Sequence, residues 1–405
     1  MSVLLDEPLF PGVMHKMIEN AFLGLLVFLN IQTAHAQYTY KNLPTFWLDL
    51  AYLYWDIQPA PEPIPLLVGT DLSIVGAILR QPDTTILLGD EEINMKGRSG
   101  GNLYAGYRFG DQLTYGIEAN YFFLPLARKT KTILTTPGGQ FQNYYLPYVN
   151  AVTGNESSRI IAVANNYGGL VSLKISNKMQ GAEVNGLGNI ICQHFGHIDL
   201  LGGVRYLNFQ EDLTYFANLP YVPGSPFPLN IYQVTDQFDT ANHFIGPQFG
   251  IKTEYFYKKL YIQATGKIAV GALLGSVDIQ GSFATNDITG TVSPSVQTFT
   301  GGFFALPTNI GTHHTTHFSI LPEIHLICGY QPANRLRFQA GYTLLYLTGV
   351  LRPGNQIDRN LNTSQSSVFQ STANPSLTGV ERPEALMKTS GLWVQGINVA
   401  VEFGF

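Results

Sequence analysis

Alternation of apolar and polar side chains with a period of two residues is the feature that most constrains the fold of this chain. The stretch INVAVEFGF, residues 397–405, carries Ile, Val and Phe at odd positions and Asn, Ala, Glu and Gly at even ones. Such a period is typical of a β-strand with two different faces. We predict a strand in each of the ten segments that share it: residues 46–55, 102–109, 113–123, 181–187, 198–207, 245–255, 260–271, 318–330, 336–347 and 392–405.

The connections between these segments alternate strictly between short and long. The short ones are residues 110–112, 189–196, 257–259 and 331–335, and the long ones are 56–100, 125–178, 210–240, 275–314 and 348–390. Loops of this length are uncommon in soluble domains, whereas transmembrane barrels combine short periplasmic turns with longer external loops. The pattern predicts an all-β fold, a single closed up-and-down antiparallel transmembrane β-barrel. We expect about ten strands, or twelve if a long loop adds a hairpin.

The last predicted strand explains why a barrel ends on an aromatic residue. In lipid every backbone group must be paired within the protein, so the last strand has to pair with the first. Its odd residues then face lipid, while Glu402 faces the lumen. Phe403 and Phe405 resemble the C-terminal signal that the bacterial barrel-assembly machinery recognises. We therefore expect this machinery and outer-membrane lipid as partners, with the oligomeric state left open.

The N-terminal region predicts export. In HKMIENAFLGLLVFLNIQTAHAQ, residues 15–37, a short basic start precedes an apolar run and small residues at Ala34 and Ala36. The apolar run, residues 21–31, is shorter than the roughly 20 residues of a membrane-spanning helix. We expect a cleaved signal peptide at residues 1–36, with Met14 as an alternative start, and a barrel at residues 37–405. The predicted location is the bacterial outer membrane.

Composition excludes several classes of protein. Charged residues make up 13% of the chain and the net charge is −5, so no basic excess exists to neutralise the phosphates of a nucleic acid. The two cysteines, Cys192 and Cys328, form neither a disulfide framework nor a metal-ligand pattern. We find no phosphate-binding glycine loop, zinc-protease helix or nucleophilic serine elbow, and we predict no cofactor.

Two groups of residues are candidates for chemistry. The first contains three histidines, His313, His314 and His317. On one strand the first and last would lie about 13 Å apart, too far for a shared metal ion unless a turn gathers them. The second contains four acidic residues near the third long loop, Glu211, Asp212, Asp236 and Asp239. They could form a catalytic pair or a calcium-like cluster, but we interpret both groups as surface residues and predict neither a metal site nor an enzyme.

Charged side chains of the polar face should point into the lumen: Asp49, Arg108, Glu118, Glu183, Asp199, Arg205, Lys252, Glu254, Lys267, Glu323, Arg337 and Glu402. Acidic and basic groups are nearly balanced, so they could form ion pairs that fill the barrel or could line a polar path. Barrels of eight strands are filled by their own side chains, and barrels of about 16 strands hold a wide channel. With about ten strands, we expect a lumen that is largely filled by salt-bridged side chains.

Several motifs resemble an outer-membrane β-barrel family best known from planctomycetes. They are GRSGGNLYAGYRF (97–109), DLLGGVRYLNFQEDL (199–213), FDTANHFIGPQFGI (238–251), GGFFALPTNIG (301–311) and GYQPANRLRFQAGYTLLYLTGVLRPGNQIDRNLN (329–362). The resemblance implies the barrel and its location, and it brings no catalytic residues. We predict a structural or surface-presenting role in the envelope. The alternatives are a narrow porin-like channel for ions or small solutes and, third, an outer-membrane enzyme.

Overall fold

The structure is a computed structural model that describes residues 44–71, 79, 81–109, 114–135, 140–163, 166–193, 195–221, 230–287, 293 and 295–405. The predicted signal peptide and the predicted turn at 110–112 lie outside these residues. Within the described ranges, no helix is long and apolar enough to cross a membrane.

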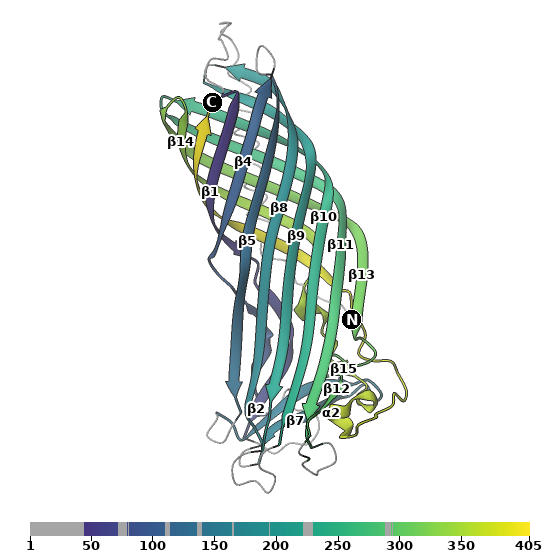
Figure 1. Ribbon diagram of the computed structural model, residues 1–405. Coiled ribbons are helices and arrows are strands. Elements are labelled where there is room, and N and C mark those ends of the chain that lie inside the picture. The colour runs from purple at the N-terminus through teal and green to yellow at the C-terminus, as the bar shows by residue number, and fades with distance from the viewer. Residues whose placement is uncertain are drawn as a thin grey trace, which may run out of the picture. The chain divides into compact units, whose positions relative to one another are not determined.

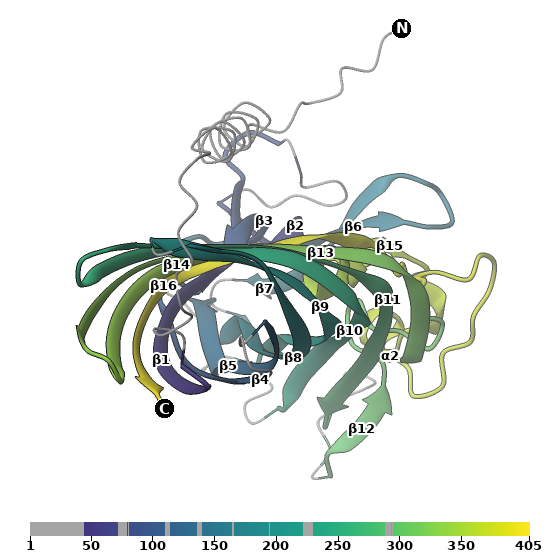
Figure 2. The same cartoon turned by 90° about the horizontal axis from the view of Figure 1, so that it is seen from above.

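Ten long strands form a closed antiparallel barrel (Figures 1 and 2). Their order is β10-β9-β8-β5-β4-β1-β16-β14-β13-β11, and pairing of β10 with β11 closes the ring. Each predicted segment overlaps one strand, so the prediction of a ten-stranded barrel is confirmed. The strands are β1 (Phe46–Ile57), β4 (Arg98–Phe109), β5 (Tyr115–Leu134), β8 (Leu170–Gln193), β9 (Gly196–Asn218), β10 (Tyr232–Tyr257), β11 (Leu260–Thr285), β13 (Gly311–Ala333), β14 (Leu336–Leu351) and β16 (Thr389–Gly404).

The first and last strands pair along almost their whole length. Their register runs from Trp47 opposite Gly404 to Ile57 opposite Val394. The final residue extends this ladder, because the Phe405 amide donates to the Phe46 carbonyl over 2.8 Å and the Phe46 amide donates back over 3.1 Å. The C-terminal residue therefore leaves no free strand edge at this seam.

The two ends of the barrel differ in the length of their connections. At one end, called the turn end here, β10 and β11 are joined by residues 258–259 and β13 and β14 by residues 334–335. The opposite end, the loop end, carries most of the remaining elements (Figure 1). These are β2 (Ala60–Thr70), β3 (Thr85–Ile93), β6 (Asn143–Asn150), β7 (Glu156–Val163), β12 (Gln297–Thr300), η1 (Pro353–Gln356), β15 (Asn360–Leu361), η2 (Thr363–Gln365) and α2 (Ser367–Gln370).

A second sheet forms from the long connections. Strands β15, β6, β2 and β3 are neighbours in that order, and β7 pairs with β6. Its buried side chains, such as Leu66 and Leu146, share one apolar cluster with Leu213 and Phe238 of the barrel. Strand β12 pairs with β11 instead, as an extra strand at the end of the barrel. The long loops therefore form a packed cap, whose core is shared with the barrel, rather than new barrel strands.

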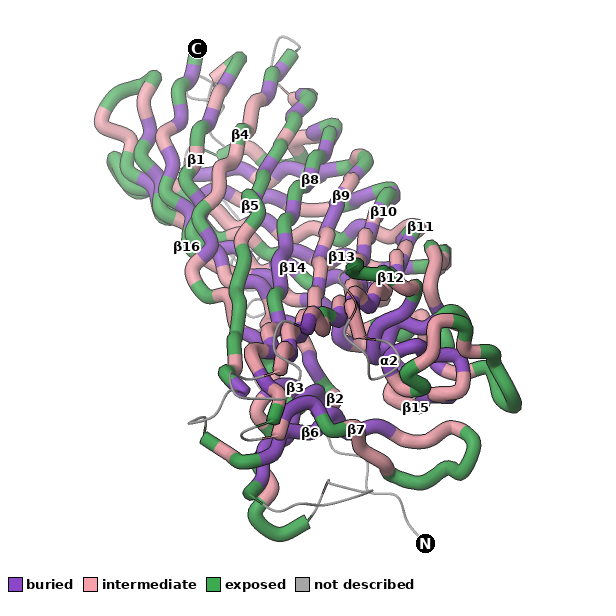
Figure 3. Tube along the Cα trace, turned by 60° about the horizontal axis from the view of Figure 1, so that its bottom comes forward, coloured by how far each residue is buried: buried purple, intermediate pink, exposed green. Residues whose placement is uncertain are grey.

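The strands on one side of the barrel are much longer than the predicted segments. Partway along each of them, the apolar residues change from the outer face to the inner face. In β9 the outward residues Leu200 and Val204 are exposed and apolar, whereas further along the strand the apolar residues Leu213 and Tyr215 point inward. The same change of phase occurs in β8, β10 and β11. Buried and more exposed positions largely alternate along these strands (Figure 3). The prediction followed one apolar face, so it ended each strand where that face becomes polar.

Exposed side chains define a membrane-facing band on the turn-end side of this inversion. Its centre carries aliphatic residues such as Leu103, Val184, Ile268 and Ile397. Aromatic residues flank it, as in membrane barrels generally. Those at the turn end are Phe46, Tyr107, Phe109, Tyr115, Tyr255, Tyr257, Tyr330, Phe338, Phe403 and Phe405, and those on the loop side are Tyr52, Tyr54, Tyr121, Phe123, Phe318, Tyr342 and Tyr346.

Candidate functional site

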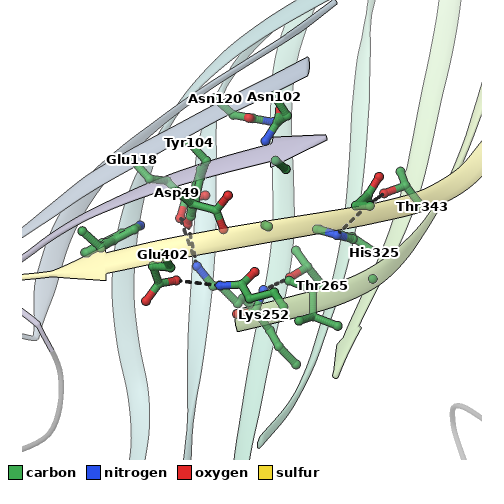
Figure 4. A pocket seen from close by; sticks show the side chains of 18 of the residues that line it. Asp49, Asn102, Tyr104, Glu118, Asn120, Lys252, Thr265, His325, Thr343 and Glu402 are labelled. Atoms are coloured by element: carbon green, nitrogen blue, oxygen red, sulfur yellow. Dashed lines mark hydrogen bonds and ion pairs between the residues drawn. The ribbon is translucent and has the colours of Figure 1, made fainter. Parts of the chain in front are cut away.

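The lumen is the candidate site, because strand alternation gathers most of the charged groups of the barrel there. Where the odd or even residues of a strand meet lipid, the residues between them must point inward. Ten of the twelve charged residues predicted for the lumen line one cavity of about 120 Å³ (Figure 4). The other two, Asp199 and Arg205, are 0% and 2% exposed and pair with members of that lining.

Four charges from four strands, three of the lining and Arg205 behind it, form one group. Lys267 of β11 lies 2.6 Å from Glu183 of β8 and 2.8 Å from Glu323 of β13. Arg205 of β9 contacts the same two carboxylates, at 3.2 Å from Glu183 and in a shorter contact with Glu323. Each cation thus bridges both anions, and the four groups span the lumen with balanced charge.

Further ion pairs continue toward the turn end. Arg108 lies 2.5 Å from Asp199, and Lys252 lies 3.4 Å from Glu118 while donating to the Tyr104 hydroxyl over 2.6 Å. Arg108 and Glu118 lie on neighbouring strands, but their positions are diagonal, and each has its partner across the lumen instead.

The wall beside the C-terminus carries an acidic excess. Arg337 lies 3.3 Å from both Glu254 and Glu402. Glu402 is also opposite Asp49 in the pairing of β1 with β16. Asp49 is 6% exposed, and its Oδ1 atom has no hydrogen-bond partner in the described part of the chain. In Figure 4 the side chains of Asp49, Glu118, Lys252 and Glu402 come from four strands and face a common space.

An apolar layer, which the sequence analysis missed, fills the lumen on the loop side of these charges. Nine of the ten barrel strands contribute to it, and members such as Phe209, Phe244 and Leu345 are 0% exposed. The full set is Leu53, Trp55, Ile57, Phe122, Leu124, Met179, Leu207, Phe209, Phe244, Ala269, Leu273, Leu321, Leu345, Leu347, Val350, Leu392 and Val394. A segment with apolar residues on both faces, LLYL at 344–347, was the available signal.

A buried polar layer separates this apolar layer from the core of the cap. Arg352, which precedes η1, is fully buried and holds Glu211 through contacts of 2.5 and 2.9 Å. The Asn242 side chain donates to the Leu351 carbonyl over 2.9 Å and accepts from the Leu351 amide over 2.8 Å. These groups fix the long connection between β14 and β16 to the inside of the barrel.

The four acidic candidates for catalysis do not meet at one site. Glu211 and Asp236 point inward, whereas Asp212 and Asp239 lie directly opposite each other on the outer wall. Asp236 is fully buried and accepts hydrogen bonds from the amides of residues 303–305, at 2.8 to 3.1 Å. Burial raises the pKa of Asp236 to about 6, against the lowering effect of those three bonds. This residue anchors the segment between β12 and β13.

The histidine candidates are also separate. His313 contacts the Asn309 carbonyl over 3.0 Å and His317 the Gly349 carbonyl over 2.8 Å, while His314 points to the exposed face. Among the residues that the structure describes, no group of three or more His, Cys, Asp or Glu side chains could hold a metal ion.

Comparisons with known proteins identify the family. Residues 47–405 match the family described as "Putative beta barrel porin-7 (BBP7)". No curated protein sequence matches the chain. The solved structures with similar folds include the outer membrane protease OmpT from Escherichia coli, at 8% identity over 89% of this chain and 96% of that one, with a TM-score of 0.42. Another is a FadL homologue from Pseudomonas aeruginosa, at 9% identity over 90% and 93% of the two chains, with a TM-score of 0.22. The chain belongs to the porin-like outer-membrane β-barrel family that its residues 47–405 match.

Proposed function

We propose that this protein is a closed outer-membrane barrel with a structural and surface-presenting role, whose lumen does not conduct solutes. The observation that carries the proposal is the apolar layer, in which residues such as Leu207, Phe244 and Leu347 are inaccessible to water. Moving an ion through such a layer without compensating polar groups costs many kcal/mol. The charged lining then stabilises the barrel from inside by balanced ion pairs.

The cap supports the surface-presenting part of the proposal. External loops that merely connect strands need no core, but here Phe303, Phe304 and Tyr144 are buried at 0–1% exposure in a cluster shared with the barrel. Buried polar anchors, such as Asp236 and Arg352, hold the loop segments in one arrangement. A fixed external surface of this kind suits display or adhesion better than a mobile lid would.

A narrow channel is the second candidate, and the cavity of about 120 Å³ with its charged lining favours it. Recording from single barrels in planar bilayers separates the two. We expect no steady conductance from the natural chain. A triple variant that removes large side chains from the apolar layer, Phe209→Ala/Phe244→Ala/Leu345→Ala, should conduct, because water can then enter the layer. Steady conductance of the natural chain whose ion selectivity changes in Arg205→Ala would overturn the closed lumen.

We also propose that the protein is not an enzyme. The acidic residues that could act as a catalytic pair are divided between the two faces of the wall, and the inward ones are used as anchors. Incubation of intact cells with peptide substrates would test this. Cleavage that is abolished by Glu211→Gln in a correctly folded barrel would contradict it.

A further inference from the structure

Three cations stand together on the outer wall of the barrel, beyond the membrane-facing band. Arg128 belongs to β5, Lys174 and Lys178 belong to β8, and all three are exposed. Arg128 is opposite Ser176, so it lies diagonally between the two lysines on the same face. Diagonal neighbours on a sheet are about 7–8 Å apart, which is within the reach of one multivalent anion.

These three residues, called the cation triad below, have no ion-pair partner among the residues that the structure describes. None of them forms an ion pair or hydrogen bond there. The cations on the opposite face of β5 differ, because Lys129 donates to the Asn94 carbonyl over 2.9 Å and Lys131 lies 2.8 Å from Glu91. Asp212 of β9 is opposite Ser176 and so lies diagonally between the two lysines, but its carboxylate accepts a hydrogen bond from Ser176 over 3.0 Å and pairs with neither lysine. Lys174 also attracts the carboxylate of Asp239 on β10 electrostatically, but the two residues form no ion pair.

The height of the triad on the wall indicates its partner. On β5 the stacked rings of Tyr121 and Phe123 mark the loop-side aromatic belt, and the exposed Leu126 follows. Arg128 comes directly after this apolar stretch. On β8 the exposed Val184 and Ala182 give way to Gln180 and then to Lys178. In a bacterial barrel the loop end is external, so the triad lies at the level of the headgroups of the outer leaflet.

We propose that the cation triad binds the phosphate group of an outer-leaflet lipid headgroup, whose acyl chains lie against the apolar wall below. A phosphate group carries more than one negative charge and several acceptor oxygens, so it can bind three neighbouring cations that form no ion pair within the protein. The adjoining Leu126 and Phe123 supply the apolar surface that a soluble anion would not use. The proposal rests on the outer-membrane placement of the barrel and is independent of whether the lumen conducts.

The test compares matched sets of charge removals in the purified full chain. The triad variant is Arg128→Gln/Lys174→Gln/Lys178→Gln. The control, Lys258→Gln/Lys259→Gln/Arg335→Gln, removes the same charge at the turn end. A charge-preserving variant exchanges Lys and Arg within the triad. Each protein, in a neutral detergent, is titrated with lipid A carrying two phosphates, and bound lipid is counted by native mass spectrometry.

We expect the natural chain, the control and the charge-preserving variant to bind lipid A alike, and the triad variant to bind about 100-fold more weakly, at about 1 kcal/mol for each cation. Binding should also weaken as salt is added. Should the triad variant fail to fold, as judged by heat-dependent gel mobility, Arg128→Gln alone should still lower affinity about five-fold. Equal binding by the natural chain and the triad or single variant would overturn the proposal. So would full competition by inorganic phosphate at the same phosphate concentration, which would show a site for a free anion.

Discussion

At the scale of single residues, Arg205 offers the sharpest test of how the lumen is stabilised. It is 2% exposed and contacts both Glu183 and Glu323, so that without it Lys267 would face the two carboxylates as the one remaining cation among the ion pairs of the described residues. Breaking a buried ion pair from one side costs about 3–5 kcal/mol. We expect Arg205→Met to lower the free energy of unfolding by about that amount in denaturant titrations of the barrel in detergent. Arg335→Met, at the exposed turn, is the control, and equal stability of the two variants would contradict buried ion pairing.

Asp236 provides a test by pH outside the membrane-facing band. Its pKa of about 6 in the folded protein is above the ordinary 3.8 of an unfolded chain, because of burial. The folded state therefore holds this proton more tightly, and the ionisation of Asp236 removes stability as pH rises from about 4 through 6. A difference of about two pKa units corresponds to about 3 kcal/mol. We expect the cap of the natural chain to lose protection from hydrogen exchange over that pH range relative to Asp236→Asn. Parallel pH profiles for the two proteins would refute the assignment, and Asp278→Asn on the outer wall is the control.

At the scale of one element, β16 tests the assembly signal. Phe403 is 40% exposed on the lipid side, whereas Ala400 is 6% exposed and lines the lumen cavity. Lysine on the lipid face costs up to about 2–4 kcal/mol at the membrane midplane and less near its edges. Phe403→Lys should therefore reduce the yield of folded barrel in cells more than Ala400→Lys does. Deletion of Phe405 should also reduce it, since its backbone closes the seam with Phe46. Equal yields for the two lysine variants would reject this facing.

The strands show how far sequence reasoning reaches. Alternation located all ten barrel strands because lipid demands one continuously apolar face, as at Ile397, Val399 and Phe403 of β16. Past the membrane the outside meets water and the inside meets the cap, so the apolar residues change from odd to even positions or the reverse. In β10 they pass from Ile245 and Phe249 to Phe238 and Val234. A search for apolar residues at only odd or only even positions therefore ends the strand where they change position, about halfway along it.

The candidate site was less predictable than the strands. The odd or even position of each charged residue in its strand placed it on the inner face. The partner of each charge, however, depends on which strands face each other across the closed ring. Arg108 thus pairs with Asp199, 91 residues away, rather than with the diagonal Glu118. The apolar layer was missed because members such as Leu345 and Leu347 alternate with Leu344 and Tyr346, which are apolar or aromatic too. Only the closed barrel shows that they meet at one level.

At the scale of the whole barrel and its cap, the inversion of polarity divides one β-structure between two solvents. In the membrane-facing part the outside is apolar and the inside charged, while in the cap-bearing part the outside is polar and the inside apolar. The division requires the cap end to project into water. If it is external, side chains there are accessible from outside intact cells, and those at the turns are not.

Cysteine labelling tests this orientation. In a background of Cys192→Ala/Cys328→Ala, we expect a membrane-impermeant maleimide to label Val152→Cys in intact cells, because Val152 is 63% exposed at the tip of the β6–β7 hairpin. Asn334→Cys, in the exposed turn between β13 and β14, should react only after the outer membrane is permeabilised. Both sites are exposed in the folded protein, so a difference between them reports the membrane rather than burial. Labelling of Asn334→Cys in intact cells, with Val152→Cys protected until permeabilisation, would reverse the orientation and place the cation triad at the inner leaflet instead.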